Sequence, residues 1–265
     1  MIEIMGVVNV TPDSFSDGGE HADPDDAVAH GLALRDAGAT ILDVGGESTR
    51  PGAQPVGSEE ERRRVLPVVE RLAAAGAVVS IDTYRADVAA DAVRAGASIV
   101  NDVSGGLADD GMLAAVAATE ATLVIGHWRG PSADMYARAS YDDIVAETTD
   151  ELAARTAAAG EAGIPAGRLV LDPGIGFAKA GERNWELLRG LERIVRIGPP
   201  VLVGTSRKRF LAGAIGDDAS RDRRDLATAV TSVLAQQAGA WGVRVHDVAA
   251  TRDALAVLDA WEGAR

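Results

Sequence analysis

Residues 39–82 read ATILDVGGESTRPGAQPVGSEEERRRVLPVVERLAAAGAVVSID and hold two short apolar runs on either side of a charged stretch. The first run, ATILDVG, covers 39–45, and the second, AVVSID, covers 77–82. Both runs are rich in Val, Ile and Leu and show little polar alternation, which is typical of strands buried on both faces of a parallel sheet. Two successive parallel strands need a long crossover, so we expect a helix between them.

The charged stretch carries helix signals at both ends. Ser58 and Glu61 form a capping-box pattern, which predicts the start of the helix. Apolar residues then recur at helical spacing from Val65 to Leu72, and Gly76 predicts the end of the helix. Residues 39–82 therefore predict one strand–helix–strand unit.

The same alternation covers the whole chain. Further helices are expected from Asp23-Pro24 to Gly38 and over 85–95, 143–159, 222–238 and 252–262. Eight strands alternating with helices admit a closed (β/α)8 TIM barrel or an open doubly wound sheet, and the pattern alone leaves both open. The eight apolar runs are EIMGVVN, ATILDVG, AVVSID, ASIVND, TLVIGH, RLVLD, PVLVG and WGVRVHD.

The composition is that of a globular α/β protein with one large core. The chain has 265 residues, of which 47% are hydrophobic, and a barrel of eight strand–helix units needs roughly 250 residues. We therefore expect a single domain over 1–265. A net charge of −14 argues against a surface built for nucleic acid or anionic lipid. The chain has no cysteine and begins MIEIMGVVNV, without a leader, so a cytoplasmic protein is expected.

Nearly every predicted strand ends in polar residues. The carboxyl ends of parallel strands meet at one face, so these side chains are expected to converge around one ligand. Taken singly, an Asp or Asn after a strand is as often a helix cap or a turn former. The repetition favours a binding or catalytic site. The residues are Asn9, Asp43, Glu47, Asp82, Asn101, Asp102, His127, Arg129, Asp172, Ser206, Arg207, Lys208, Arg244, His246 and Asp247.

Basic groups near the end of the chain indicate an anion site. In GTSRKRF (204–210), the side chains of Ser206 and Lys208 could hold an anion together with backbone N–H groups. Arg244 and His246 alternate with Val in WGVRVHD, so they are expected on one side of their strand. Cations beside carboxylates and amides suit a flat heterocycle that carries a phosphate group.

Two long loops, over 9–20 and 47–55, are expected to bind or cover this ligand, because structureless loops of this length are seldom mere spacers.

The sequence as a whole resembles the dihydropteroate synthase family, from Met5 to about Val248. The segments that carry the resemblance are MGVVNVTPDSFSDGG (5–19), DVGGESTRPGA (43–53), SIDTYR (80–85), NDVSGG (101–106), LDPGIGFAK (171–179), GTSRKRF (204–210) and RVHDV (244–248). HWR at 127–129 is similar to the actinobacterial branch.

The resemblance implies a closed barrel, and it implies an activity. Members of the family condense 6-hydroxymethyl-7,8-dihydropterin pyrophosphate with para-aminobenzoate, giving 7,8-dihydropteroate and pyrophosphate in folate biosynthesis. They depend on Mg2+, form homodimers and are sulfonamide targets. The C–O bond to pyrophosphate breaks first and the aminobenzoate amine then attacks, so no nucleophilic side chain is needed.

The resemblance also implies a role for individual residues. The pterin ring would be bound by Asp82, Asn101, Asp172 and Lys208. The pyrophosphate would be bound by Arg244 and His246, and Asn9 would ligate Mg2+ together with it, so that Asn9, Lys208, Arg244 and His246 are the catalytic candidates. The aminobenzoate pocket and its loops would hold Phe15, Thr49, Arg50, Pro51 and Phe177.

Two positions depart from the family pattern. Many relatives have Met where this chain has Gly126, and we expect Gly126 to leave a gap that costs on the order of 1 to 3 kcal/mol in ligand affinity. Arg209 stands where many relatives have Ser, and it would pair with the aminobenzoate carboxylate or point to solvent.

Two other functions are compatible with parts of the pattern. A barrel that passes a methyl group from methyltetrahydrofolate to a corrinoid protein would share pterin-binding Asp and Asn residues. It would not need the two long loops or the Arg244–His246 pair. A non-catalytic pterin-binding paralogue is the second alternative, and Gly126 is the feature that favours it.

Overall fold

In the computed structural model, residues 2–11, 23–47, 56–130 and 139–263 are described. They contain one eight-stranded sheet in the order β6-β5-β4-β3-β2-β1-β8-β7, and all neighbouring strands are parallel. The strands are Glu3–Asn9 (β1), Ile41–Gly45 (β2), Val79–Asp82 (β3), Ile99–Asp102 (β4), Thr122–Gly126 (β5), Leu169–Asp172 (β6), Leu202–Val203 (β7) and Gly242–Val245 (β8). All eight strand predictions are confirmed.

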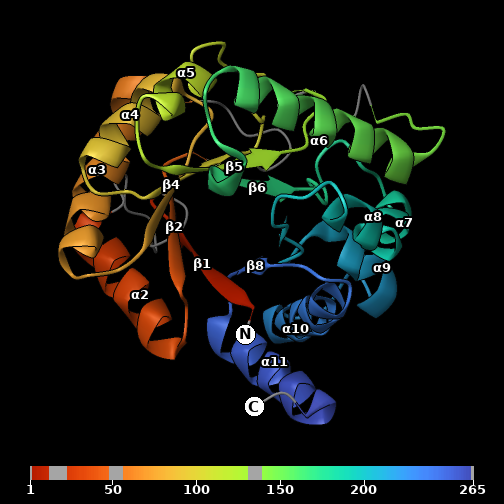
Figure 1. Cartoon of the computed structure of the whole chain (residues 1–265). Helices are drawn as coiled ribbons and strands as arrows, with labels where there is room; N and C mark the ends of the chain where they lie inside the picture. Colours follow the sequence, from red (N-terminus) through yellow and green to blue (C-terminus); the bar gives the residue numbers. More distant parts are fainter. Residues whose placement is uncertain (1, 12–22, 48–55, 131–138, 264–265) are drawn as a thin grey trace.

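The sheet closes into a barrel. Its two end strands, β6 and β7, are joined through a parallel bridge between Leu171 and Val201, and the Leu171 N–H donates to the Pro200 carbonyl at 2.8 Å. Helices surround the ring of strands (Figure 1). The (β/α)8 barrel is therefore confirmed, and the open doubly wound sheet is excluded.

The predicted helices are present, together with several short ones. The four helices α5, α7, α8 and α9 are not predicted from the sequence, because four to seven residues show too little periodicity. The helices are Pro24–Ala37 (α2), Ser58–Ala74 (α3), Ala86–Arg94 (α4), Met112–Ala117 (α5), Ile144–Glu161 (α6), Arg183–Arg189 (α7), Leu191–Val195 (α8), Ala212–Ile215 (α9), Arg221–Gln237 (α10) and Val248–Glu262 (α11). None of the described helices is long and apolar enough to cross a membrane.

The capping box predicted for α3 is wrong. Gly57 is the N-cap, and Ser58 is already the first helical residue and makes no side-chain cap bond. Glu61 is only 1% exposed and forms an ion pair with Arg85 instead. The last helix, α11, begins four residues earlier than predicted, because the Asp247 side chain caps it by accepting from the Ala250 N–H at 3.0 Å.

An apolar layer fills the inside of the barrel below the strand ends. It consists of Met5, Ile41, Ile99, Val124, Val170 and Leu202, with Trp241 packed against it. Side chains of a strand alternate between its two faces, so the residue two positions further along lies on the same inner side, one layer closer to the mouth. These positions hold Asn101, Asp172 and Asp43, among others. The strand period therefore places a polar layer directly above an apolar one.

Candidate active site

Arg244 on β8 forms the centre of the polar layer. Its Nε lies 2.6 Å from Asp43 Oδ2 and its Nη2 lies 2.7 Å from Asp82 Oδ2. Asn101 on β4 donates from Nδ2 to the same Asp43 oxygen at 3.1 Å. Four strands thus contribute one hydrogen-bonded cluster. The sequence predicted Asp82, Asn101 and Arg244 as site residues, and the structure brings them together.

Asp43 joins this cluster, as expected of the polar residues that end the strands, although the family resemblance gave it no individual role. Its side chain is fully buried, and its Oδ1 accepts no hydrogen bond within the described residues. A buried, unpaired carboxylate oxygen is costly unless a ligand donates to it. Its place two residues after the inward-facing Ile41 puts its side chain inside the barrel.

Burial and the close charges of this cluster shift the pKa values of its members. Burial raises the pKa of Asp82 to about 7, although Arg244 opposes this shift. Burial also opposes the charge on Arg244, but Asp43 and Asp82 more than offset it and raise the pKa of the guanidinium. Asp82 is therefore poised to change charge near neutral pH, while Arg244 stays cationic.

Asp172 ends β6, which lies opposite β2 in the ring of strands, and Lys208 follows β7, the neighbour of β8. The Lys208 ammonium donates to the Ile175 carbonyl and lies 4.8 Å from the centroid of the half-buried Phe177 ring. Asp172 Oδ1 accepts from the Gly174 N–H at 2.7 Å. Burial lowers the pKa of Lys208 to about 8, although Asp172 opposes this shift. Both predicted residues thus lie around the turn that follows β6.

The segment after β7 forms a tight turn. Arg207 has a positive φ of 57°, and its guanidinium forms a double ion pair with Asp225 on α10, at 2.7 and 2.8 Å. Ser206 Oγ lies 2.8 Å from His246 Nδ1 and accepts from the His246 N–H at 3.1 Å. Asp225 therefore holds this turn against α10.

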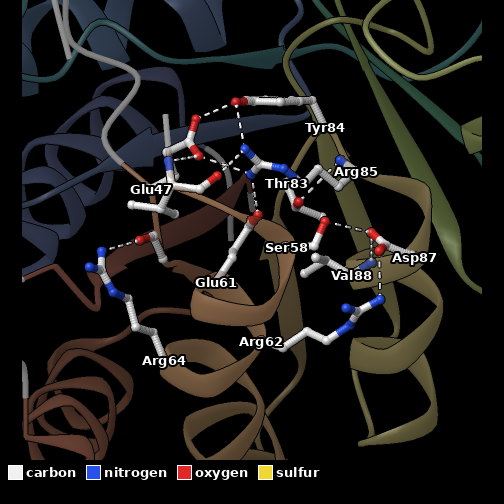
Figure 2. Close-up of polar contacts among 12 residues, drawn as sticks. Glu47, Ser58, Glu61, Arg62, Arg64, Thr83, Tyr84, Arg85, Asp87 and Val88 are labelled. Atoms are coloured by element: carbon white, nitrogen blue, oxygen red, sulfur yellow. Dashed lines mark hydrogen bonds and ion pairs between the residues drawn. The ribbon is translucent and has the colours of Figure 1, made fainter. Parts of the chain in front are cut away.

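A second polar network involves the residues that follow Asp82 in the chain. Figure 2 shows Glu47, Tyr84, Arg85 and Glu61 pointing toward one another. Glu47 accepts from the Tyr84 hydroxyl and, at 2.9 Å, from both the Val56 N–H and the Arg85 guanidinium. The Arg85 guanidinium also donates to the Val56 carbonyl. Residues on either side of 48–55 are therefore tied to the segment that follows Asp82.

The gap predicted at Gly126 is wrong. A Cβ atom at this position would lie 2.4 Å from the carbonyl oxygen of Val103 and 2.6 Å from its Cα. The backbone that follows β4 therefore occupies the space that a side chain at 126 would need. Gly126 is required by a close backbone approach, and it gives no support to a defective pterin site.

The remaining predicted residues have varied positions. Asn9 is half-buried at the end of β1, and Arg209 is exposed at the start of a short 3-10 helix, which agrees with its solvent-facing alternative. Phe15, Thr49, Arg50 and Pro51 lie outside the described residues. Within the described part of the chain, no group of three His, Asp or Glu side chains could hold a metal ion.

Comparison with known proteins agrees with this geometry. The family described as pterin binding enzyme matches residues 5–246. The dihydropteroate synthase of Mycobacterium leprae is 54% identical, over 98% of this chain and 93% of its own length. That of Streptococcus pyogenes serotype M6 is 43% identical, over 96% and 94%.

Solved structures of the same kind superpose closely. The Xanthomonas albilineans dihydropteroate synthase with 4-aminobenzoic acid has a TM-score of 0.92 and 48% identity, covering 98% of this chain and 93% of that one. The structure of the same enzyme with 7,8-dihydropteroate has a TM-score of 0.87 and 44% identity, covering 98% and 94%. The chain therefore belongs to the family of pterin-binding enzymes, and within it to the dihydropteroate synthases.

Proposed function

We propose that the chain joins 6-hydroxymethyl-7,8-dihydropterin pyrophosphate to para-aminobenzoate, releasing pyrophosphate and forming 7,8-dihydropteroate. The observation that carries this proposal is the polar layer of Asp43, Asp82, Asn101 and Arg244, with Lys208 and Asp172 at the same barrel mouth. Relatives that bind 4-aminobenzoic acid and 7,8-dihydropteroate superpose over nearly the whole chain.

The pterin ring is proposed to bind between the two sides of the mouth. A pterin has several hydrogen-bond donors and acceptors on its edges, and carboxylates, an amide and an ammonium supply partners of both kinds. Asp43 Oδ1 adds a buried acceptor without a protein partner. Because a wrong ligand would leave these buried groups unpaired, the site selects for a heterocycle with the matching pattern.

The leaving pyrophosphate is proposed to bind at Arg244, His246 and the 205–208 turn. Arg244 stays charged, and the turn brings Ser206 to His246. Fixed positive groups stabilise the charge that grows on the leaving oxygen as the C–O bond breaks. The aminobenzoate amine then forms the new C–N bond to the methylene carbon and loses a proton, so no side chain acts as a nucleophile.

A Mg2+ ion fits this site only together with the pyrophosphate. Mg2+ often binds through one or two protein oxygens plus substrate phosphates and water, and Asn9 can supply one amide oxygen at the end of β1. When bound, the ion would neutralise charge on the pyrophosphate. Asn9 would orient the ion, and Arg244 would bind the phosphates beside it.

A homodimer is proposed through the outer faces of α10 and α11. Large apolar side chains are exposed on α10 at intervals of four residues, and two more are exposed on α11. A second copy of the chain would cover such a face. The residues are Leu226, Val230, Leu234, Val257 and Trp261. Sedimentation equilibrium tests this, and a Leu234→Glu variant should shift the protein toward the monomer.

The cytoplasmic location and sulfonamide sensitivity remain predictions from the sequence.

The decisive experiment measures pyrophosphate release and dihydropteroate formation with both substrates and Mg2+. We expect product from the wild-type protein, loss of activity with EDTA, and loss in Asp82→Ala. An Arg62→Gln variant is the control, because Arg62 pairs with Asp87 and Asp91 between the outer helices α3 and α4. Pterin binding without product would favour the non-catalytic paralogue, and methyl transfer from methyltetrahydrofolate would favour the corrinoid alternative.

A further inference from the structure

A lysine is fully buried beneath the turn that follows β6. Lys179 is 1% exposed, and its Nζ lies 2.9 Å from His127 Nδ1, 3.0 Å from the Gly174 carbonyl oxygen and 2.9 Å from the Phe177 carbonyl oxygen. Within the described residues no carboxylate lies within ion-pair distance of it. Burial lowers the pKa of Lys179 to about 7, and an ammonium held here by neutral acceptors alone is uncommon because desolvation opposes its charge.

The three acceptors match the three protons of an ammonium group, whereas a neutral amine has only two to donate. Burial lowers the pKa of His127 to about 4, and the nearby Lys179 adds to this effect, so the imidazole is neutral. Because its Nδ1 accepts from Lys179, its proton resides on Nε2, which donates to Glu151 at 2.9 Å. Each hydrogen bond from Lys179 through His127 to Glu151 therefore has one donor and one acceptor.

Lys179 fixes both ends of one turn. The Phe177 N–H closes the turn by donating to the Gly174 carbonyl at 2.9 Å, and Lys179 donates to the carbonyls of both residues. Asn184 holds the middle of the turn, because its Oδ1 accepts from the Gly176 N–H at 2.7 Å. With its ends and centre fixed, the turn has little freedom to move.

The upper side of this turn contacts two pterin-site residues. The Ile175 carbonyl accepts from Lys208, the Phe177 ring lies beside the same ammonium, and the Gly174 N–H donates to Asp172. Lys179 contacts the turn only through the Gly174 and Phe177 carbonyls. It therefore acts on Lys208 and Asp172 through the backbone and not by direct contact.

We propose that Lys179 is a positioning residue for pterin binding, which holds the Gly174–Phe177 turn so that Lys208 and Asp172 meet the ring in a fixed geometry. The proposal rests on the proposed function and adds a residue that neither contacts the reacting atoms nor lines the mouth. Loss of Lys179 should weaken binding of the pterin substrate in the ground state and transition state alike, and so raise KM more than it lowers kcat.

The test compares Lys179→Met and Lys179→Gln with the wild-type protein. For Lys179→Met we expect KM and the directly measured Kd for dihydropterin pyrophosphate to rise about ten- to hundredfold, with kcat within about threefold. Lys179→Gln keeps two of the three donors, so its Kd should rise less. This variant also decides the matter if Lys179→Met does not fold.

Two control variants separate positioning from general destabilisation. Glu151→Gln changes the charge on the far side of the same His127 but keeps an acceptor for its Nε2 proton, and its Kd should stay within about threefold of wild type. Leu152→Ala removes a fully buried side chain of α6 that makes none of the hydrogen bonds of the turn. It should lower the melting temperature without changing the Kd.

The outcomes are distinct. An inactive wild-type protein would refute the proposed function and not the role of Lys179, which the Kd for the pterin would then still report. Wild-type activity with unchanged pterin affinity in both Lys179 variants would overturn the positioning role. An equal loss of affinity in Leu152→Ala would also overturn it, because destabilisation alone would then explain the effect.

Discussion

Two sides of the barrel hold the cations at and beneath its mouth in different ways. On the side of β2, β3 and β8, Arg244 is bound by the carboxylates of Asp43 and Asp82. On the side of β6 and β7, Lys208 and the deeper Lys179 are bound by backbone carbonyls and an imidazole. The cation is therefore held by carboxylates on the first side and by neutral acceptors on the second.

The largest effect is expected on the carboxylate side, in Arg244→Met. The substitution leaves Asp43 and Asp82 buried without a cation, which should lower the free energy of unfolding by about 3 to 5 kcal/mol and abolish pyrophosphate release. Urea denaturation and the activity assay measure the two effects. Arg252→Met is the control, because its ion pair with Asp253 is exposed, and it should change stability by less than about 1 kcal/mol. Unchanged stability in Arg244→Met would contradict the comparison.

A smaller loss of stability is expected on the carbonyl side, in Lys208→Met. The change leaves one Ile175 carbonyl without its donor, which should cost about 1 to 3 kcal/mol. Pterin affinity should nevertheless fall by about ten- to hundredfold, because a charge-assisted hydrogen bond to the ligand is lost. Denaturation and calorimetric titration check the two quantities. The distinction between the sides fails if Lys208→Met unfolds as readily as Arg244→Met.

Crowding at the end of β5 should be measurable in Gly126→Ala. The new Cβ would overlap the Val103 backbone, and overpacking of this kind costs about 1 to 3 kcal/mol. Gly167→Ala is the matched control, because nothing lies within 4 Å of a Cβ there. Thermal melts of both variants test the point. If Gly126→Met instead improved pterin affinity, the predicted gap would be real after all.

The smallest effect is a pH dependence of pterin affinity. Asp82 has a pKa raised to about 7 and Lys208 one lowered to about 8, so both groups are charged together only between these values. Pterin affinity should therefore peak at about pH 7 to 8. Asp82→Asn should remove the acid limb, and Lys208→Met the alkaline one. A profile unchanged in both variants would assign the limbs to other groups.

The shifted pKa values of Asp82 and Lys208 also make the free energy of unfolding depend on pH, in opposite directions. Asp82 binds its proton more tightly when folded, so its contribution to the free energy of unfolding is lost as pH rises through about 7. Lys208 binds its proton less tightly when folded, so its contribution increases as pH rises above about 8. Denaturation of the two variants across this range separates the contributions.

The sequence predicted the strands and most of the polar layer, because strand period and strand ends are local properties. It failed where a residue's partner is distant along the chain. Glu61 pairs with Arg85 and not with a helix end, and the Val103 backbone fills the space at Gly126. Lys179 follows a glycine-rich turn like a surface lysine, and only folding around His127 buries it. Closure of the barrel came from the family resemblance, since an open sheet has the same pattern.

The two faces of helix α10 make different contacts. Its inner face holds the 205–207 turn, where Thr228 accepts from the Arg207 N–H and Thr231 bonds to Thr205. Its outer face carries the apolar side chains proposed to meet a second copy. If pterin binding shifts self-association through this helix, thermodynamic linkage requires self-association to change pterin affinity by the same factor. The apparent affinity for the pterin substrate would then depend on protein concentration, and dilution alone would reveal it.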